Sequence, residues 1–383
     1  MTNKKTPSIR FKGFTDDWEQ RKLGDIAKFI NGRAYAQNEL LPSGKYKVLR
    51  VGNFYTNDSW YYSDLELDDK YYANDGDLLY TWSATFGPHI WRGDRVIYHY
   101  HIWKIDLTDE LEKHFAVQLL EQDKNDILSG HNGSTMAHIT KEGMEQKKVV
   151  IPKNIWEQRQ LGLFFDNLDN LITLHQRECE RLQIVKKSML ENMFPKNGER
   201  VPKIRFSGFT DDWEQRKVSE IANRYDNLRV PVAASERVSG STPYYGANGI
   251  QDYVDGYTHD GEFVLIAEDG ANDLKNYPVQ YTTGKIWVNN HAHVLQGKEK
   301  ITDNKFLGYS INATNIESLL VGGGRAKLNA EVLMGIELLM PSYLEQCRIS
   351  EFLFNLDNLI TLHQSKLEKL RLIKKSMLEQ MFV

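Results

Sequence analysis

The chain has 383 residues, of which 41% are hydrophobic and 26% are charged, and its formal net charge at pH 7 is −4. These fractions are ordinary for a globular protein, and the length predicts two or more domains with sizeable cores. The negative charge argues weakly against a free-standing DNA binder, since such domains usually carry a basic excess. Local basic surfaces or basic partners still permit contact with DNA.

No apolar run approaches the ~20 residues that a membrane-spanning helix needs, and the N-terminal residues include no apolar signal core. We therefore expect a cytoplasmic protein with no membrane partner. Cys179 and Cys347 are the two cysteines of the chain, too few for a disulfide framework or a cysteine-rich zinc site. Cys179 is predicted to be a small core residue.

An internal duplication organises the sequence. Residues 7–22 read PSIRFKGFTDDWEQRK, and residues 202–217 read PKIRFSGFTDDWEQRK. A second pair of segments, 157–194 and 345–382, aligns without a gap, and about three positions in five are identical. The order of motif, variable region and long helix therefore occurs twice, and no motif follows the second helix. We expect the N-terminal segment to pack near the C-terminal helix end, as in a circularly permuted two-fold arrangement.

The segments 157–194 and 345–382 have apolar residues seven positions apart and polar residues elsewhere, which is typical of coiled coils. A single helix of roughly 50 Å, at ~1.5 Å per residue, cannot bury such a seam alone. We therefore expect two long antiparallel helices that pack on each other. The seam is predicted to contain Leu161, Leu168, His175, Leu182, Met189, Ile349, Leu356, His363, Leu370 and Met377, with the two histidines forming a polar layer. The predicted flanks are Phe164, Leu171, Val185, Phe352, Leu359 and Ile373, three residues further on, and Phe165, Ile172, Cys179 and Met193, four residues further on.

Two variable regions, 23–152 and 218–341, match poorly in sequence but share their landmarks. Each has strand-like runs, one amphipathic helix candidate and a closing apolar strand that ends in proline, so we predict two related α+β domains. The expected strands cover 46–51, 77–82, 95–105 and 148–152 in the first region and 263–267, 285–295 and 337–341 in the second. The expected helices cover 111–122 and 304–318. The remaining segments are the two motifs, 1–22 and 201–217, and the two helical repeats, 153–200 and 342–383.

Motifs of common enzymes are absent from the sequence. It contains no P-loop, no dinucleotide-binding glycine motif, no Gly-x-Ser-x-Gly elbow and no pair of adjacent prolines, which amino-methyltransferases have in their catalytic motif. Two His-x-His pairs, His99 with His101 and His291 with His293, would each face one side of a strand, as a metal site needs. No third ligand recurs near both pairs, so packing or contact with nucleic acid is favoured.

Residues suited to DNA recognition occur in both variable regions. Arg, Lys and Asn side chains make the bidentate contacts that distinguish bases, whereas Ser and Thr hold phosphates. The glycine turn at 322–324, followed by Arg325 and Lys327, is the best individual candidate, because the backbone can approach a phosphate closely there. The predicted DNA-binding residues are Arg33, Lys45, Arg50, Asn53, Trp82, Arg92, Ser134, Thr135, Tyr245, Asn248, Asn272, Lys275, Asn290, Arg325 and Lys327.

Taken together, these motifs resemble the specificity subunit of type I restriction–modification systems. The resemblance rests on the KGFTDDWEQRKL and SGFTDDWEQRKV blocks, the NLDNLITLHQ repeats and the KKSMLE(N/Q)MF helix ends, and it covers nearly the whole chain. Within the variable regions it also rests on residues 48–53, 76–79 and 243–249. The first region lacks the Gly-Gly-Gly-Arg-Ala-Lys turn of the second, so site residues cannot be mapped from one region to the other.

The resemblance implies a non-catalytic DNA reader. Each variable region would be a target recognition domain for one half of a bipartite, asymmetric sequence in double-stranded DNA, and the helices would set the spacer and dock two modification subunits. Those methyltransferase subunits would carry S-adenosylmethionine, restriction subunits would use ATP and Mg, and this chain would hold no cofactor. Two alternatives stay open: an enzyme that modifies nucleic acid through an unrecognised site, and a coiled-coil scaffold without a nucleic-acid role.

Overall fold

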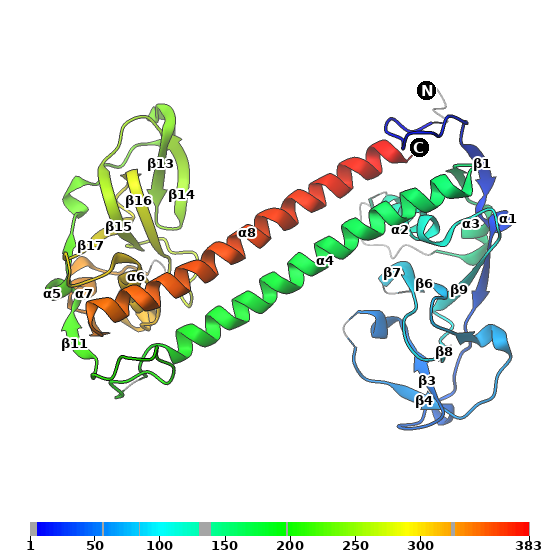
Figure 1. Ribbon diagram of the computed structural model, residues 1–383, viewed down its shortest axis with the longest axis horizontal. Coiled ribbons are helices and arrows are strands. Elements are labelled where there is room, and N and C mark those ends of the chain that lie inside the picture. Colours follow the sequence, from blue (N-terminus) through cyan, green and yellow to red (C-terminus); the bar gives the residue numbers. More distant parts are fainter. Residues whose placement is uncertain are drawn as a thin grey trace. The chain divides into compact units, whose positions relative to one another are not determined.

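The computed structural model describes residues 6–55, 57–83, 85–129, 139–196, 198–322 and 326–382 (Figure 1). The chain divides into two compact units: unit 1 consists of residues 1–175 and 366–383, and unit 2 of residues 176–365. The boundaries fall inside two long helices, α4 (Ile155–Asn192) and α8 (Tyr343–Met381), so each unit contains one part of each helix. Every helix in the described part of the chain is too short or too polar to cross a membrane.

Unit 1 contains two four-stranded sheets, with the strand orders β2-β9-β6-β7 and β4-β3-β8-β5, and a separate pair of β1 with β10. All pairings are antiparallel except that of β3 with β8. The strands are β1 (Glu19–Lys22), β2 (Ala27–Asn31), β3 (Tyr46–Leu49), β4 (Tyr61–Ser63), β5 (Tyr72–Ala73), β6 (Leu78–Ser83), β7 (Thr85–Ile90), β8 (Val96–Tyr98), β9 (Ile102–Leu107) and β10 (Lys148–Ile151). The shorter helices are α1 (Leu23–Ile26), α2 (Lys113–Ser129) and α3 (Lys141–Gln146), with 3₁₀ turns η1 (Gln37–Glu39), η2 (Val51–Phe54) and η3 (Asp69–Tyr71).

Unit 2 contains one six-stranded sheet, with the order β12-β17-β15-β16-β13-β14, and a separate pair of β11 with β18. Its strands are β11 (Glu214–Lys217), β12 (Ala222–Arg224), β13 (Ser239–Gly246), β14 (Gly249–Val254), β15 (His259–Ala267), β16 (Val279–Val288), β17 (Ala292–Gly297) and β18 (Glu337–Met340). The shorter helices are α5 (Val218–Ile221), α6 (Asn304–Asn312) and α7 (Ala330–Gly335), with 3₁₀ turns η4 (Asp226–Leu228), η5 (Ala234–Glu236) and η6 (Ile316–Leu319).

The two units share a topology, which confirms the predicted α+β fold with an internal pseudo-two-fold repeat. β9 lies between β2 and β6 in unit 1, as β17 lies between β12 and β15 in unit 2. The single strand β16 takes the places of two strands of unit 1. It pairs antiparallel with β15 as β7 does with β6, and it pairs in parallel with β13 as β8 does with β3.

Several predicted elements have other boundaries in the structure. The runs 95–105 and 285–295, each predicted as one strand, are each two strands joined by a turn, at 99–101 and 289–291. The turns consist of His-Tyr-His and Asn-Asn-His, and these polar and aromatic residues interrupt the two apolar runs. The helix predicted at 304–318 ends at Asn312 and is followed by η6, whereas the helix predicted at 111–122 extends to Ser129.

The duplicated motif joins each unit's strands to a helix end. In unit 1, β1 pairs with β10, and the fully buried Trp18 makes an edge contact with Phe382. The backbone N–H of Ile9 also donates to the carbonyl of Gln380, near the end of α8 (3.0 Å). The N-terminal segment therefore lies against the end of α8. The residues that make the equivalent contacts in unit 2 are Trp213, Phe194, Ile204 and Asn192.

Within each unit the two helix parts pack antiparallel through an apolar seam. The seam positions Leu161, Phe165, Leu168, Cys179, Leu182, Met193, Ile349, Leu353, Leu356, Ile360 and Met381 are buried. His175, Met189, His363, Leu370 and Met377 are half-buried. The predicted flanking residues Leu171, Leu359 and Ile373 are exposed. The second row of seam residues, such as Phe165, therefore lies four residues after the first row, such as Leu161, and not three. A heptad allows both spacings.

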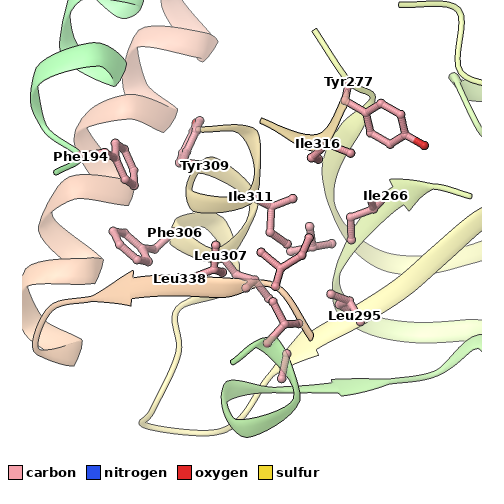
Figure 2. Close-up of a cluster of buried hydrophobic side chains, with 14 of the residues drawn as sticks. Phe194, Ile266, Tyr277, Leu295, Phe306, Leu307, Tyr309, Ile311, Ile316 and Leu338 are labelled. Carbon is pink, nitrogen blue, oxygen red and sulfur yellow. The ribbon is translucent and has the colours of Figure 1, made fainter. Parts of the chain in front are cut away.

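The core of unit 2 lies between the sheet and the helices (Figure 2). Leu307 and Ile311 of α6 pack in the same buried cluster as Ile266 of β15. Phe306 points instead toward the helices and stacks on Phe194, with 5.6 Å between the ring centroids. α6 can start at this point because the side chain of Asp303 accepts a hydrogen bond from the N–H of Phe306 (2.8 Å).

Candidate nucleic-acid interface

In unit 1, backbone hydrogen bonds bring the ends of three strands and the start of a fourth together. The N–H of Trp82 in β6 donates to the carbonyl of His101, which precedes β9 (3.2 Å). The N–H of His99, which follows β8, donates to Leu49 at the end of β3 (2.9 Å). We call this region, with residues 49–50, 82–83 and 99–101, the strand-end surface of unit 1.

Unit 2 has an equivalent strand-end surface, formed by residues 245–246, 268 and 289–291. Here Glu268, after β15, donates to the carbonyl of His291 (2.8 Å), and Asn289, after β16, donates to Tyr245 of β13 (3.0 Å). His291 is thus the counterpart of His101 in unit 1, whereas Asn289 is the counterpart of His99. The two His-x-His pairs are therefore out of register with each other and are not a repeated site.

Two predicted arginines, Arg50 of this surface and Arg33, which forms a backbone bridge with His99, are already bound within unit 1. Arg33 donates two hydrogen bonds to Glu39 (2.8 and 2.7 Å), which raise the pKa of Arg33 and lower the pKa of Glu39 to about 2. The guanidinium carbon of Arg50 lies 4.3 Å from the ring centroid of Tyr61, and its Nη2 donates to the carbonyl of Ser59 (3.3 Å). The charge of Arg33 is therefore neutralised by Glu39, whereas Arg50 keeps its positive charge and is held in place by Tyr61 and Ser59.

Aromatic and imidazole rings fill the rest of this surface. Trp82 donates its indole N–H to the carbonyl of Tyr100 (2.9 Å) and stacks on Trp103. His99 and His101 lie in the turn before β9 and not on a strand, with 4.9 Å between their ring centroids. Burial lowers the pKa of both histidines, that of His99 to about 4, so both rings are neutral at pH 7. The rings provide stacking and hydrogen-bonding groups but no positive charge.

Two other predicted residues lie away from this surface. Lys45 precedes β3, at the opposite end of that strand from Arg50, and its ammonium is bound to Glu66. Arg92 follows the far end of β7, and it lies 3.5 Å from Asp75. The structure therefore does not bring these residues together with Arg33, Arg50 and Trp82.

In unit 2, the predicted residues Asn248, Asn272 and Lys275 meet at one loop, residues 268–277, which lies in the connection from β15 to β16. Asn248, in the turn after β13, donates to the carbonyl of Gly270 and accepts from the N–H of Asn272 (both 2.9 Å). The side chains of Asn272 and Lys275 are exposed on this loop. Asn290 is exposed in the turn between β16 and β17, and the hydroxyl of Tyr245 accepts a hydrogen bond from Thr282 (3.3 Å).

Lys327 belongs to a charge cluster beside this loop. Asp226, Glu268 and His293 place their ligand atoms within 4.8 Å of one another, a spacing that could suit a metal ion. However, Glu268 already accepts from Arg229 (2.7 Å) and Lys327 (2.8 Å), and His293 contacts Asp226 (2.6 Å) and a backbone carbonyl (2.9 Å). Burial acts to raise the pKa of Glu268, but these two cations lower it overall. The cluster is best described as a buried ion-pair network that fixes the loops.

Three predicted DNA-binding residues, Ser134, Thr135 and Arg325, lie outside the described part of the chain. Sequence reasoning missed two acidic residues that shape this interface. Glu268 anchors Arg229 and Lys327 from opposite sides, and nothing local in the sequence indicates this role. Asp273 accepts hydrogen bonds from the N–H groups of Lys275 and Asn276, a turn pattern that its Asp-x-x-Asn spacing could have predicted.

Comparison with known proteins identifies the class. The sequence model of the type I restriction modification DNA specificity domain matches residues 15–183 and 210–372. The chain therefore belongs to this family and contains its domain twice, and the expected class, a specificity subunit and not an enzyme, is confirmed.

Two relatives support this assignment, and one solved structure has the same fold. A putative type I restriction enzyme specificity subunit of Haemophilus influenzae, S.HindORF215P, is 50% identical over 140 residues, which are 37% of this chain and 36% of that protein. The type I restriction enzyme MjaVIII specificity subunit of Methanocaldococcus jannaschii is 24% identical over 405 residues, covering 95% of this chain and 91% of that protein. The crystal structure of a type I restriction–modification S subunit from M. genitalium has the same fold, with a TM-score of 0.73, 15% identity and 99% coverage of both chains.

Proposed function

We propose that this chain reads a bipartite, asymmetric sequence in double-stranded DNA for a type I restriction–modification complex, each unit recognising one half. The observation that supports this proposal is that the two units have equivalent strand ends but different loops at those ends. In unit 1, β6 and β7 pair as far as Ser83 and Thr85, whereas in unit 2 the equivalent strands are joined by the loop 268–277. A common scaffold with different loops is what two readers of different half-sites require.

Replacement of residues 23–152 by the corresponding region of a relative with another target tests this division of labour. We expect one half of the recognised sequence to change and the other half to stay the same, because the second unit keeps its own loops. Sequencing of the modified sites in DNA from cells that carry the hybrid complex gives both halves in one measurement. A change in both halves would contradict the proposal of two independent readers.

The helices carry a second part of the proposal, the docking of two identical modification subunits. Both units expose apolar side chains on their helix parts, at positions related by the repeat. In unit 1 these are Leu171, Leu174 and Leu372, and in unit 2 they are Leu359, Leu362 and Ile184. They lie outside the buried seam, at heptad positions that face away from the partner helix. Repeated exposed apolar positions of this kind fit two copies of one partner that offers an apolar helical surface.

Charged substitutions should remove the partner copies one at a time. We expect Leu171→Glu with Leu174→Glu to lower the number of bound modification subunits from two to one, and Leu359→Glu with Leu362→Glu to do the same. Native mass spectrometry of the assembled complex measures this stoichiometry. Thr173→Glu and Thr361→Glu are matched controls, since both threonines are exposed but lie on the other side of each helix. Unchanged stoichiometry in the leucine variants would contradict this docking surface.

In this proposal the chemistry belongs to the partners. The modification subunits bind S-adenosylmethionine, the restriction subunits use ATP and Mg, and the complex acts in the cytoplasm. This assignment accords with the ion-pair network in unit 2, whose carboxylates are already bound by Arg229 and Lys327.

A further inference from the structure

The loop 268–277 of unit 2 is held in one conformation from several sides. At its base, the hydroxyl of Tyr277 donates to the carbonyl of Ala267 (2.9 Å). At its tip, Asp273 accepts from the N–H groups of Lys275 (2.9 Å) and Asn276 (3.0 Å). These bonds leave Lys275 exposed on a shaped loop, and such preorganisation lowers the entropy lost on binding.

The flank of this loop is fixed by Asn248. Its amide N–H donates to Gly270, and its amide oxygen accepts from the backbone N–H of Asn272. Base recognition by asparagine needs the same two groups, since the bidentate contact to adenine uses one amide donor and one amide acceptor. Both amide groups of Asn248 therefore form hydrogen bonds with the loop, although its side chain is exposed.

Asn53 of unit 1 also uses both amide groups, but its partners lie in the segment that directly follows its own strand. It follows β3, the strand equivalent to β13, and its amide oxygen accepts from the N–H of Arg50 (3.0 Å). Its amide N–H₂ donates to the carbonyls of Asn57 (3.0 Å) and Ser59 (2.9 Å). The carbonyl of Ser59 also accepts from the guanidinium of Arg50 (3.3 Å), so Asn53 helps to fix the place of that side chain.

We infer that Asn53 and Asn248 are equivalent positioning residues for sequence recognition, and that the loops they hold make the contacts with bases. This inference rests on the proposed DNA-reading function and replaces the direct base contact predicted for the two residues. The equivalent strands β3 and β13 are followed by Asn53 and Asn248. In each unit this asparagine holds a nearby segment in place, and the two segments differ. In unit 2 this arrangement presents Asn272 for contact with bases and Lys275 for contact with a phosphate.

Selection from a pool of random-sequence DNA duplexes, with the full chain assembled with its modification subunits, tests the inference. The wild-type complex should enrich a bipartite sequence. Asn248→Ala should relax preference at several neighbouring base pairs of one half-site, with a roughly 10-fold loss of discrimination, because two hydrogen bonds that hold the loop are lost. Asn53→Ala should do the same at the other half-site. Each variant is the control for the other, since each leaves one half-site intact and so demonstrates a folded chain.

Two further variants separate positioning from contact. Asn248→Asp keeps the acceptor for Asn272 but turns a carboxylate toward the carbonyl of Gly270, so it should behave as Asn248→Ala does. Lys275→Ala should instead weaken binding to all sequences and reduce the salt slope by about 1. The asparagine variants should leave the salt slope unchanged, because a neutral amide displaces no counterion.

The outcomes are distinguishable. Loss of preference at a single base pair in Asn248→Ala would identify a direct base contact and overturn the positioning role. Equal relaxation of both half-sites, or an unchanged preference, would overturn it as well. If the wild-type complex enriches no sequence, the proposed DNA-reading function itself fails, and the inference fails with it.

Discussion

Side chains with the right chemistry for DNA are mostly bound to their own protein. Arg33 pairs with Glu39, and Lys327 pairs with Glu268, so both are held in ion pairs. Residue type determines what a side chain can bind, but the partner is determined by which segments fold next to it. Glu268 lies 59 positions before Lys327 in the chain, and no local pattern connects the two.

The half-buried His89 predicts a pH dependence of stability in unit 1. Its ring stacks on Phe54, with centroids 4.1 Å apart, and its Nε2 contacts the hydroxyl of Tyr55 (3.0 Å). Burial lowers the pKa of His89 to about 4, with a smaller contribution from Lys124. The pKa in the unfolded chain is ~6.5, so the unfolded state binds more protons between these values. We therefore expect the free energy of unfolding to fall by roughly 1–3 kcal/mol as pH decreases from 6.5 to 4.

Urea unfolding at a series of pH values measures this effect. His89→Gln removes the titrating group and should give a flatter dependence on pH over the same window, while retaining a side chain that can hydrogen-bond to Tyr55. An identical slope in the variant would show that His89 is not the residue responsible.

At the scale of single elements, the seam of the two long helices has one lysine ion pair per unit, in addition to the half-buried His175 and His363. Lys186 lies four residues after the buried Leu182, at a seam position, and pairs with Asp357 (2.5 Å). The equivalent pair in unit 1 is Lys374 with Asp169 (2.6 Å). A lysine at such a position specifies the register of two helices at a cost in stability. The apolar heptads of α4 and α8 are similar along their length and would allow several registers. The two lysine–aspartate pairs explain why the helices pack in only one of them.

If Lys186 specifies the register of the helices, its replacement should raise the stability of the fold but lower the specificity of helix pairing. Lys186→Leu should raise the free energy of unfolding by about 1 kcal/mol, because a seam position becomes apolar. Asp357 keeps a hydrogen bond from the hydroxyl of Tyr309 (2.7 Å). The same variant should form additional oligomers, which sedimentation velocity detects. Lys187→Leu, at an exposed position outside the seam, is the matched control. Lower stability of Lys186→Leu would show that the ion pair is a net stabilising interaction.

At the scale of the whole molecule, both helices run without a break from one unit into the other, over 38 residues in α4 and 39 in α8. A continuous helix is the stiffest connection that a chain can make between two domains. This continuity supports the proposal that the helices set the spacer between the half-sites.

Insertion of one heptad after His175 and one after His363 tests the spacer. Seven residues keep the seam in phase and lengthen each helix by ~10 Å, which is ~3 base pairs at ~3.4 Å each. We expect a recognised sequence with the same two half-sites and a spacer longer by ~3 base pairs, read by selection from random DNA duplexes. Insertion into one helix alone should prevent folding, because the antiparallel seam would then be out of register. An unchanged spacer in the double insertion would exclude the helices as its determinant.

The sequence by itself determined the duplication, the two long helices and the α+β class, because repeats and heptads are properties of neighbouring positions. The tertiary structure alone decided which strand ends meet, that β16 replaces β7 and β8, and that Asn53 and Asn248 hold loops. Each of these depends on hydrogen bonds whose partners the fold selects. The amide of Asn248, for example, meets a carbonyl 22 residues further along the chain. Its side chain has the groups for reading a base, and the position of that carbonyl decides how they are used.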